Sequence, residues 1–285
     1  MIPVSEKIKH IELLTKRLMH VNLLGHARSV VKGSGLEFDQ LRDYQIGDDV
    51  RALDWNSSAR MNKLLVKQFN DERHRTVIIA LDVSASCFYG SDATLKHDIL
   101  AQIAAIISYA GYLGKDEVGL VLFSDVIECY IPPRKGRAHI QLILEKIFST
   151  QKKETTTNLN SVLDHILQLR KKNAMVFLIS DFIADGFEKK LSICAQVCDV
   201  IAIRMLDMYE HALPPVGLLT VQDSETKQMQ VIDSRSQDST DVLKERIVTQ
   251  TKLFNTHRVK VLDIVGREHL LDHLIHFFKI RNRYA

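Results

Sequence analysis

The chain has 285 residues, of which 46% are hydrophobic and 26% are charged, a composition typical of a globular protein with a substantial core. Its 38 basic and 35 acidic residues give a net charge of +3, which is too small to indicate nucleic-acid binding on its own. No apolar run approaches the roughly 20 residues that a membrane-spanning helix needs, so we expect no transmembrane segment.

The cysteines and the first residues predict the cellular compartment. Four cysteines are scattered along the chain, and only Cys194 and Cys198 are close in sequence, which favours buried reduced thiols over a zinc site. Residues 1–20 are amphipathic and charged, unlike the uninterrupted apolar segment of a signal peptide. We therefore expect a cytoplasmic protein, with peripheral attachment to a membrane as the alternative.

Residues 1–75 are expected to form an N-terminal helix followed by a small strand-containing segment. Apolar residues recur at steps of three and four from Ile8 to Val21, which predicts a helix that begins near Pro3 and ends near Leu24. An acidic stretch from Leu36 to Trp55 follows it. The segment Lys63–Phe69 then has the alternation of a strand, although both of its faces are partly apolar.

Residues 76–285 are expected to form a second domain in which strands alternate with helices. Short apolar strands separated by helices predict an α/β fold with a doubly wound, mostly parallel, Rossmann-like sheet that is covered on both faces. Residues 217–233 contain two short strands around a polar turn, which predicts an added hairpin. The expected sheet strands are Thr76–Leu81, Glu117–Phe123, Glu128–Ile131, Met175–Ile179, Asp199–Met205 and Val259–Val265.

Polar side chains follow two of these strands and precede one helix. Asp82, Ser84 and Ser86 come where the strand from Thr76 ends, and Asp181 follows the strand from Met175. Thr157 precedes a helix whose N-terminus points to the same edge of the sheet. Ligands of α/β sheets bind at that edge, so the five side chains can converge on one crevice. Carboxylate and hydroxyl oxygens are ligands for Mg²⁺ or Mn²⁺.

This set of side chains predicts binding more than catalysis. No histidine is placed to activate a serine. Hydroxyl ligands are weak and leave net positive charge on the ion, which can therefore accept an Asp or Glu carboxylate from a protein partner. The chain also has no phosphate-binding G-x-x-x-x-G-K-[ST] loop.

The ordered motifs resemble a known family. Asp82-Val83-Ser84-Ala85-Ser86, Thr157 and Ser180-Asp181 are similar to the metal-ion-dependent adhesion site of von Willebrand factor A domains. Nearly the whole chain resembles the domain of unknown function 58 (DUF58) family of bacterial proteins, which have a von Willebrand A-like domain. The segments that carry this second resemblance are Gly35–Tyr44, Gly47–Arg51, Asp54-Trp55, Arg60, Lys67–Phe69 and Pro132–Arg137.

The resemblance implies roles for the site residues. Asp82 would bind the ion directly or through water, Ser84, Ser86 and Thr157 would be hydroxyl ligands, and Asp181 would act through water. Thr156 and Phe182 stand where the family commonly has glycine. The first departure leaves open whether Thr156 or Thr157 is the ligand, and the spacing to Leu163 favours Thr157.

The family is similar in context to proteins encoded beside MoxR-type AAA+ ATPases. The resemblance therefore implies a non-enzymatic partner or adaptor of such an ATPase, in chaperone-like maturation of other proteins. One alternative is a metal-dependent phosphoester hydrolase in the same crevice, although Ser84 stands where a second aspartate would serve as acid and base. The other is a weak nucleic-acid binder, whose affinity would fall steeply with salt.

Two charged segments are candidates for partner binding. Arg134, Lys135 and Arg137 form a basic loop, for which a solvated loop at a helix entry is the favoured alternative. Asp48, Asp49 and Arg51 form the second segment. There we favour a structural clamp in which Arg51 or Arg60 pairs with Asp49 or Asp54, with Trp55 buried as an anchor.

Overall fold

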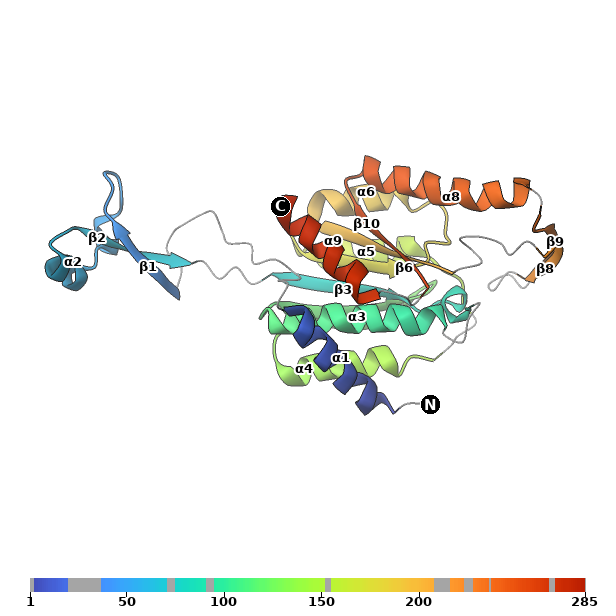
Figure 1. Ribbon diagram of the computed structural model, residues 1–285, viewed down its shortest axis with the longest axis horizontal. Helices are drawn as coiled ribbons and strands as arrows, with labels where there is room; N and C mark the ends of the chain where they lie inside the picture. The colour runs from blue at the N-terminus through green and yellow to red at the C-terminus, as the bar shows by residue number, and fades with distance from the viewer. Residues whose placement is uncertain are drawn as a thin grey trace. The chain divides into compact units, whose positions relative to one another are not determined.

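The computed structural model describes residues 3–19, 37–70, 75–90, 95–151, 155–207, 216–222, 228–235, 237–266 and 270–284. The chain divides into two compact units (Figure 1). The larger unit comprises Met1–Gly25 and Arg75–Ala285, and the smaller one comprises His26–His74. Each unit is described separately below.

The larger unit contains a six-stranded sheet in the order β10-β7-β6-β3-β4-β5. All neighbouring pairs are parallel except β4 and β5, which are antiparallel. If the six strands of this sheet are numbered by their order along the chain, the sheet reads 3-2-1-4-5-6 from the β5 edge. This is the doubly wound order. The expected α/β fold is confirmed. The strands are β3 (Thr76–Asp82), β4 (Glu117–Phe123), β5 (Ile127–Arg134), β6 (Met175–Ser180), β7 (Asp199–Leu206) and β10 (Lys260–Val265).

Both faces of this sheet are covered by helices because the central strands are apolar on both sides. In β3, Val77, Ile79 and Leu81 belong to one core cluster, whereas Ile78 and Ala80 belong to the other. The first cluster includes residues of α1 (Val4–Met19), α3 (Lys96–Leu113), α4 (Arg137–Phe148) and α9 (Leu270–Tyr284). The second includes residues of α5 (Leu159–Gln168), α6 (Glu188–Val197) and α8 (Gln237–Thr256), and Figure 1 shows α3 and α6 on opposite sides of the sheet.

The N-terminal helix α1 packs on the larger unit, whereas the sequence pattern grouped it with the segment that follows. Its apolar stripe places Ile11 in the core cluster that contains α3, with Ile8 packed against that cluster. On its polar face, Lys7 forms an ion pair with Asp98 at 3.5 Å. The stripe that predicted the helix is therefore what attaches it to the α/β sheet.

The smaller unit is built on two antiparallel strands, β1 (Glu37–Asp43) and β2 (Leu65–Asn70). The predicted strand at residues 63–69 is confirmed by β2. The strand β1 and the short helix α2 (Trp55–Met61) were not predicted. The strand β1 is polar and lacks an apolar run, so its pairing with β2 has no clear periodic signal. Asp54 does supply a start signal for α2, because its carboxylate accepts from the backbone N–H groups of Asn56 and Ser57.

The added hairpin is also confirmed. The strands β8 (Leu218–Gln222) and β9 (Met229–Asp233) pair antiparallel in a two-stranded sheet separate from the main one. Ser234 fastens its base, since the Ser234 hydroxyl and backbone N–H both donate to the Gly217 carbonyl, at 2.8 and 2.9 Å. Among the residues that the structure describes, no helix is long and apolar enough to span a bilayer.

Candidate metal centre

The candidate site lies where the sheet reverses its winding. The strands β3 and β6 are neighbours, but the helices that follow them, α3 and α6, cover opposite faces. Asp82 is the last residue of β3, and Asp181 directly follows β6. Both side chains are buried, at 0% and 3% exposure. A doubly wound fold binds ligands at this switch point, so the topology itself brings the two carboxylates together.

Three hydroxyl groups lie together beside the carboxylates. The Thr157 hydroxyl donates to Ser84 Oγ at 2.8 Å, Ser84 Oγ lies 3.0 Å from Ser86 Oγ, and Ser86 Oγ lies 3.5 Å from Thr157 Oγ1. The backbone fixes this arrangement, because the Ala85 N–H donates to the Thr155 carbonyl at 3.1 Å. Thr156 is exposed. Thr157, rather than Thr156, is therefore the threonine whose hydroxyl contacts the two serines.

Asp82 is held by Ser180, a residue of the quoted motif Ser180-Asp181 for which the sequence predicted no separate role. The Ser180 hydroxyl donates to Asp82 Oδ2 at 2.5 Å, and the Ser84 N–H donates to Asp82 Oδ1 at 2.9 Å. Burial, and after it the negative charge of Asp181, raises the pKa of Asp82 to about 7. The two carboxylates therefore repel one another in a poorly solvated place, and a cation beside them would relieve that repulsion.

Lys96 also contacts one of these carboxylates and was not among the predicted site residues. Its ammonium group donates to Asp181 Oδ2 at 2.9 Å, and the two side chains are 2% and 1% exposed. Lys96 is the first residue of α3 and shares a helical face with Leu100 and Ile103, both fully buried. The sequence did contain a signal for this buried position. Lys96 lies three and four residues before apolar core residues, and residues with this spacing share one face of a helix, so the lysine side chain is expected to point inward.

Cys87 completes the group of possible ligands. Its Sγ and carboxylate oxygens of Asp82 and Asp181 all lie within 4.8 Å of one another, so this buried trio could hold a metal ion. Burial, and after it the charge of Asp82, raises the pKa of the Cys87 thiol well above its usual value. A metal ligand must be a thiolate, so the oxygen atoms are the better prepared ligands of this site.

The structure explains how Phe182 fits into the loop that follows Asp181. Its backbone adopts a left-handed conformation with φ of 56°, which is strained for a phenylalanine. The side chain is fully buried, with its ring centroid 5.1 Å from that of Phe254 in α8. Its carbonyl accepts from the Gln250 side chain at 2.8 Å. Packing against α8 thus compensates for the strain in the loop that carries Asp181.

The basic loop is not part of this site. Arg134, Lys135 and Arg137 are all exposed, as a solvated loop at a helix entry requires. Arg134 pairs with Val118, near the start of β4, whereas Asp82 pairs with Phe123 at the end of that strand. The loop therefore lies at the opposite end of β4 from the carboxylates.

In the smaller unit, the charged residues have local structural roles. Arg42 contacts both carboxylate oxygens of Asp48 at 2.6 Å, and this hydrogen bonding lowers the pKa of Asp48 to about 2. Asp49 accepts from the Arg51 backbone N–H at 2.9 Å. Asp54 pairs with Lys67 at 3.6 Å. The observed pairs therefore differ from the expected ion pairs of Arg51 or Arg60 with Asp49 or Asp54.

The expectation that Trp55 is buried is wrong, because its side chain is 64% exposed. The residue of α2 that is buried is Ser58, whose hydroxyl accepts from the Leu65 N–H at 2.9 Å. The small polar side chain of Ser58 therefore makes the contact between α2 and β2. Trp55, the first residue of the helix, remains exposed to solvent.

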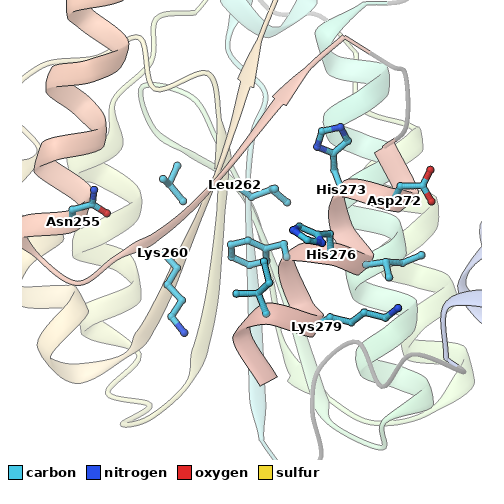
Figure 2. A pocket seen from close by; sticks show the side chains of 11 residues that line it. Asn255, Lys260, Leu262, Asp272, His273, His276 and Lys279 are labelled. Atoms are coloured by element: carbon cyan, nitrogen blue, oxygen red, sulfur yellow. The ribbon is translucent and has the colours of Figure 1, made fainter. Parts of the chain in front are cut away.

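A separate groove of about 840 Å³ lies between β10 and α9. Figure 2 shows side chains from β10, from α9 and from the end of α8 around it. His276, Lys279 and Phe277 come from α9, and Lys260, the first residue of β10, lines the groove near the amino end of that strand. The groove is therefore distinct from the site at the carboxyl ends of β3 and β6.

Comparisons with known proteins place the chain in a family. Uncharacterized proteins from Mycobacterium bovis and Mycobacterium tuberculosis are each 28% identical over 226 residues, which cover 78% of this chain and 71% of theirs. The crystal structure of the conserved hypothetical protein BatB from Bacteroides thetaiotaomicron has a TM-score of 0.47 at 13% identity, over 74% of this chain and 100% of that one. An aerotolerance-related membrane protein from Bacteroides fragilis has a TM-score of 0.46 at 12% identity, over 73% and 99%. The family model described as Protein of unknown function DUF58 matches residues 40–252, and the chain belongs to this family.

Proposed function

We propose that this chain is a non-enzymatic, metal-dependent protein-interaction protein. Asp82, Ser84, Ser86, Thr157 and Asp181 would hold Mg²⁺ or Mn²⁺, and an Asp or Glu of a protein partner would complete the coordination. The observation that carries the proposal is the meeting of two buried carboxylates and three mutually bonded hydroxyls at the switch point of the sheet.

The chemistry of these groups favours this function. Asp82 and Asp181 supply the charge that attracts a cation, and the hydroxyls add oxygen ligands without neutralising it further. The ion would supply the electrostatic attraction for an incoming carboxylate. Hydrogen bonds from Ser180 and from the Ser84 backbone orient the Asp82 carboxylate, so the chain has fixed this ligand before the ion binds.

The hydroxyl arrangement argues against nucleophilic catalysis. Ser84 bonds to Ser86 and Thr157, so its oxygen is placed as one member of a ligand set. In the alternative hydrolase a second aspartate would serve as acid and base, and Ser84 stands in its place. We therefore favour binding over the alternative of phosphoester hydrolysis.

We further propose that the partner is a MoxR-type AAA+ ATPase and that the chain is its adaptor in the maturation of other proteins. This step rests on the family resemblance. The exposed side chains of Arg134, Lys135 and Arg137 offer a second contact for an acidic surface of the same partner.

The test is a binding assay between this protein and a purified MoxR-type ATPase from the same genome. Asp82→Asn keeps the shape of the side chain but removes its charge, so we expect capture in Mg²⁺ to be lost, as it should be in wild type with EDTA. Asp164→Asn is the matched control, because Asp164 pairs with Lys190 on the surface. Capture that survives both Asp82→Asn and EDTA would contradict the metal-bridge mechanism.

A phosphoesterase assay of the same proteins addresses the alternative. Turnover in Mg²⁺ that is present in wild type and in Asp164→Asn, and absent in Asp82→Asn, would replace the binding function with a hydrolytic one.

A further inference from the structure

The candidate metal centre already contains a positive charge of its own. The Lys96 ammonium lies 2.9 Å from Asp181 Oδ2, and the exposed fractions of the two side chains are 2% and 1%. An ion pair this deeply buried is poorly screened by water or salt. Its positive charge must therefore be counted whenever another cation approaches the same carboxylates.

The backbone holds the ammonium at this place. Lys96 begins α3, and its backbone N–H donates to the Tyr89 carbonyl at 2.9 Å. One and two turns further on, Leu100 and Ile103 anchor the helix in the core at 0% exposure. The backbone of Lys96 is thus anchored at the start of α3, and the buried side chain reaches Asp181 from there.

Formal charges show the consequence. In the form that binds a metal ion, Asp82 and Asp181 are both ionised and carry two negative charges, and Lys96 carries one positive charge, which leaves one negative charge. A divalent ion converts this to one positive charge, and a carboxylate from a partner then returns the site to neutrality. Without Lys96, the divalent ion alone would neutralise the site, and a further carboxylate would leave it negative.

We propose that Lys96 is a resident counter-cation that weakens divalent metal binding in the isolated protein and couples metal uptake to the arrival of an external carboxylate. The inference rests on the proposed function and adds a regulation to that site. Because coupling is reciprocal, a carboxylate that strengthens metal binding is itself bound more tightly when the metal is present. With Lys96 present, the site would therefore bind both the metal ion and a carboxylate tightly only in the complex with the partner.

The first test is a Mn²⁺ titration of the intact protein followed by electron paramagnetic resonance. Lys96→Met removes the charge, and we expect Mn²⁺ to bind about tenfold more tightly or better than to wild type. Lys96→Gln keeps a hydrogen-bond donor for Asp181 and should behave likewise, which covers the case in which Lys96→Met fails to fold. Lys96→Arg keeps the charge and should resemble wild type. Lys190→Met removes a partly exposed lysine that pairs with Asp164 and is the control.

The second test measures the coupling with acetate as the carboxylate probe. Replacing chloride by acetate at constant ionic strength should tighten Mn²⁺ binding to wild type, and this gain should be lost in Lys96→Met. Equal Mn²⁺ affinities in wild type, Lys96→Gln and Lys96→Met would overturn the role of Lys96 and leave the metal site standing. No Mn²⁺ binding to any of these proteins would overturn the proposed function together with this inference.

Discussion

His97, the residue after Lys96, is a buried histidine whose ionisation opposes folding. Its ring stacks on Phe88 with centroids 4.2 Å apart, and its Nδ1 finds no hydrogen-bond partner among the described residues. Burial lowers the pKa of His97 to about 4 from 6.5, while Asp98 acts in the opposite direction and Lys7 of α1 adds to the lowering. The folded protein therefore holds this ring neutral, whereas the unfolded chain takes up a proton near pH 6.5.

The expected result is a loss of stability in mild acid. The pKa of His97 is lower in the folded protein than in the unfolded chain, so protonation favours the unfolded chain. The free energy of unfolding is therefore unaffected by His97 above pH 6.5 and falls as the pH drops from there towards 4. The loss from this group should be on the order of 2–3 kcal/mol. His97→Phe keeps the stacking and removes the titrating group, so its unfolding free energy in urea should fall less between pH 7 and pH 5.

Comparison at each pH separates this effect from general acid destabilisation. The carboxylates shared by both proteins titrate alike, so the difference between wild type and His97→Phe isolates His97. Parallel stability curves for the two proteins would show that the ring titrates in the folded state as it does in the unfolded one, and would contradict this account.

At the scale of elements, Arg204 joins α8 to two strands of the sheet. It lies in β7, is fully buried, and contacts both carboxylate oxygens of Asp263 in β10, at 2.7 and 2.8 Å. The same guanidinium donates to Gln250, Thr251 and the Ile247 carbonyl, all in α8. Gln250 in turn donates to the Phe182 carbonyl beside the candidate site. Arg204 therefore holds α8 on the sheet, and Gln250 of that helix contacts the loop that carries Asp181.

Replacing Arg204 should be costly for that reason. In Arg204→Met, Asp263 loses its partner and several donors to α8 disappear, so we expect a loss of roughly 2–4 kcal/mol in unfolding free energy, measured in urea. Lys190→Met breaks the partly exposed pair with Asp164 and should cost at most about 1 kcal/mol. Similar costs for the two variants would mean that the buried network adds nothing beyond a surface ion pair.

At the scale of the whole molecule, the sequence predicted what depends on strong local patterns. The continuous apolar strands predicted a sheet covered on both faces, and small polar residues at strand ends predicted the place where Asp82 and Asp181 meet. The spacing around Lys96 indicates a side chain that turns inward, but its partner Asp181 lies 85 positions away, so the ion pair could not be predicted. Ser180 was quoted with Asp181, but its hydrogen bond to Asp82 spans 98 positions and was not predicted either. Trp55 was misplaced because size alone was taken as a sign of burial, whereas burial in α2 depends on which face meets β2.

Among the described residues, the two units differ in how many buried apolar side chains they contain. The larger unit has two extensive core clusters. In the smaller unit, the described apolar residues that are buried are Leu53, Leu65 and Val66, at 9%, 5% and 5% exposure. A unit as short as His26–His74 buries a smaller fraction of its surface than a large domain does, so it has less hydrophobic stabilisation to offset the entropy of folding. The two units are therefore expected to unfold in separate transitions.

Trp55 makes this separation measurable, because it is the one tryptophan of the chain and lies in the smaller unit. We expect the fluorescence anisotropy of Trp55 to fall at lower urea than the far-ultraviolet circular dichroism signal, which reports mainly on the larger unit. Arg204→Met should move the dichroism midpoint to lower urea and leave the Trp55 midpoint unchanged, because Arg204 lies in the larger unit. If instead the two signals coincide in wild type and shift together in Arg204→Met, the chain unfolds in one cooperative transition, and the expectation of separate transitions is wrong.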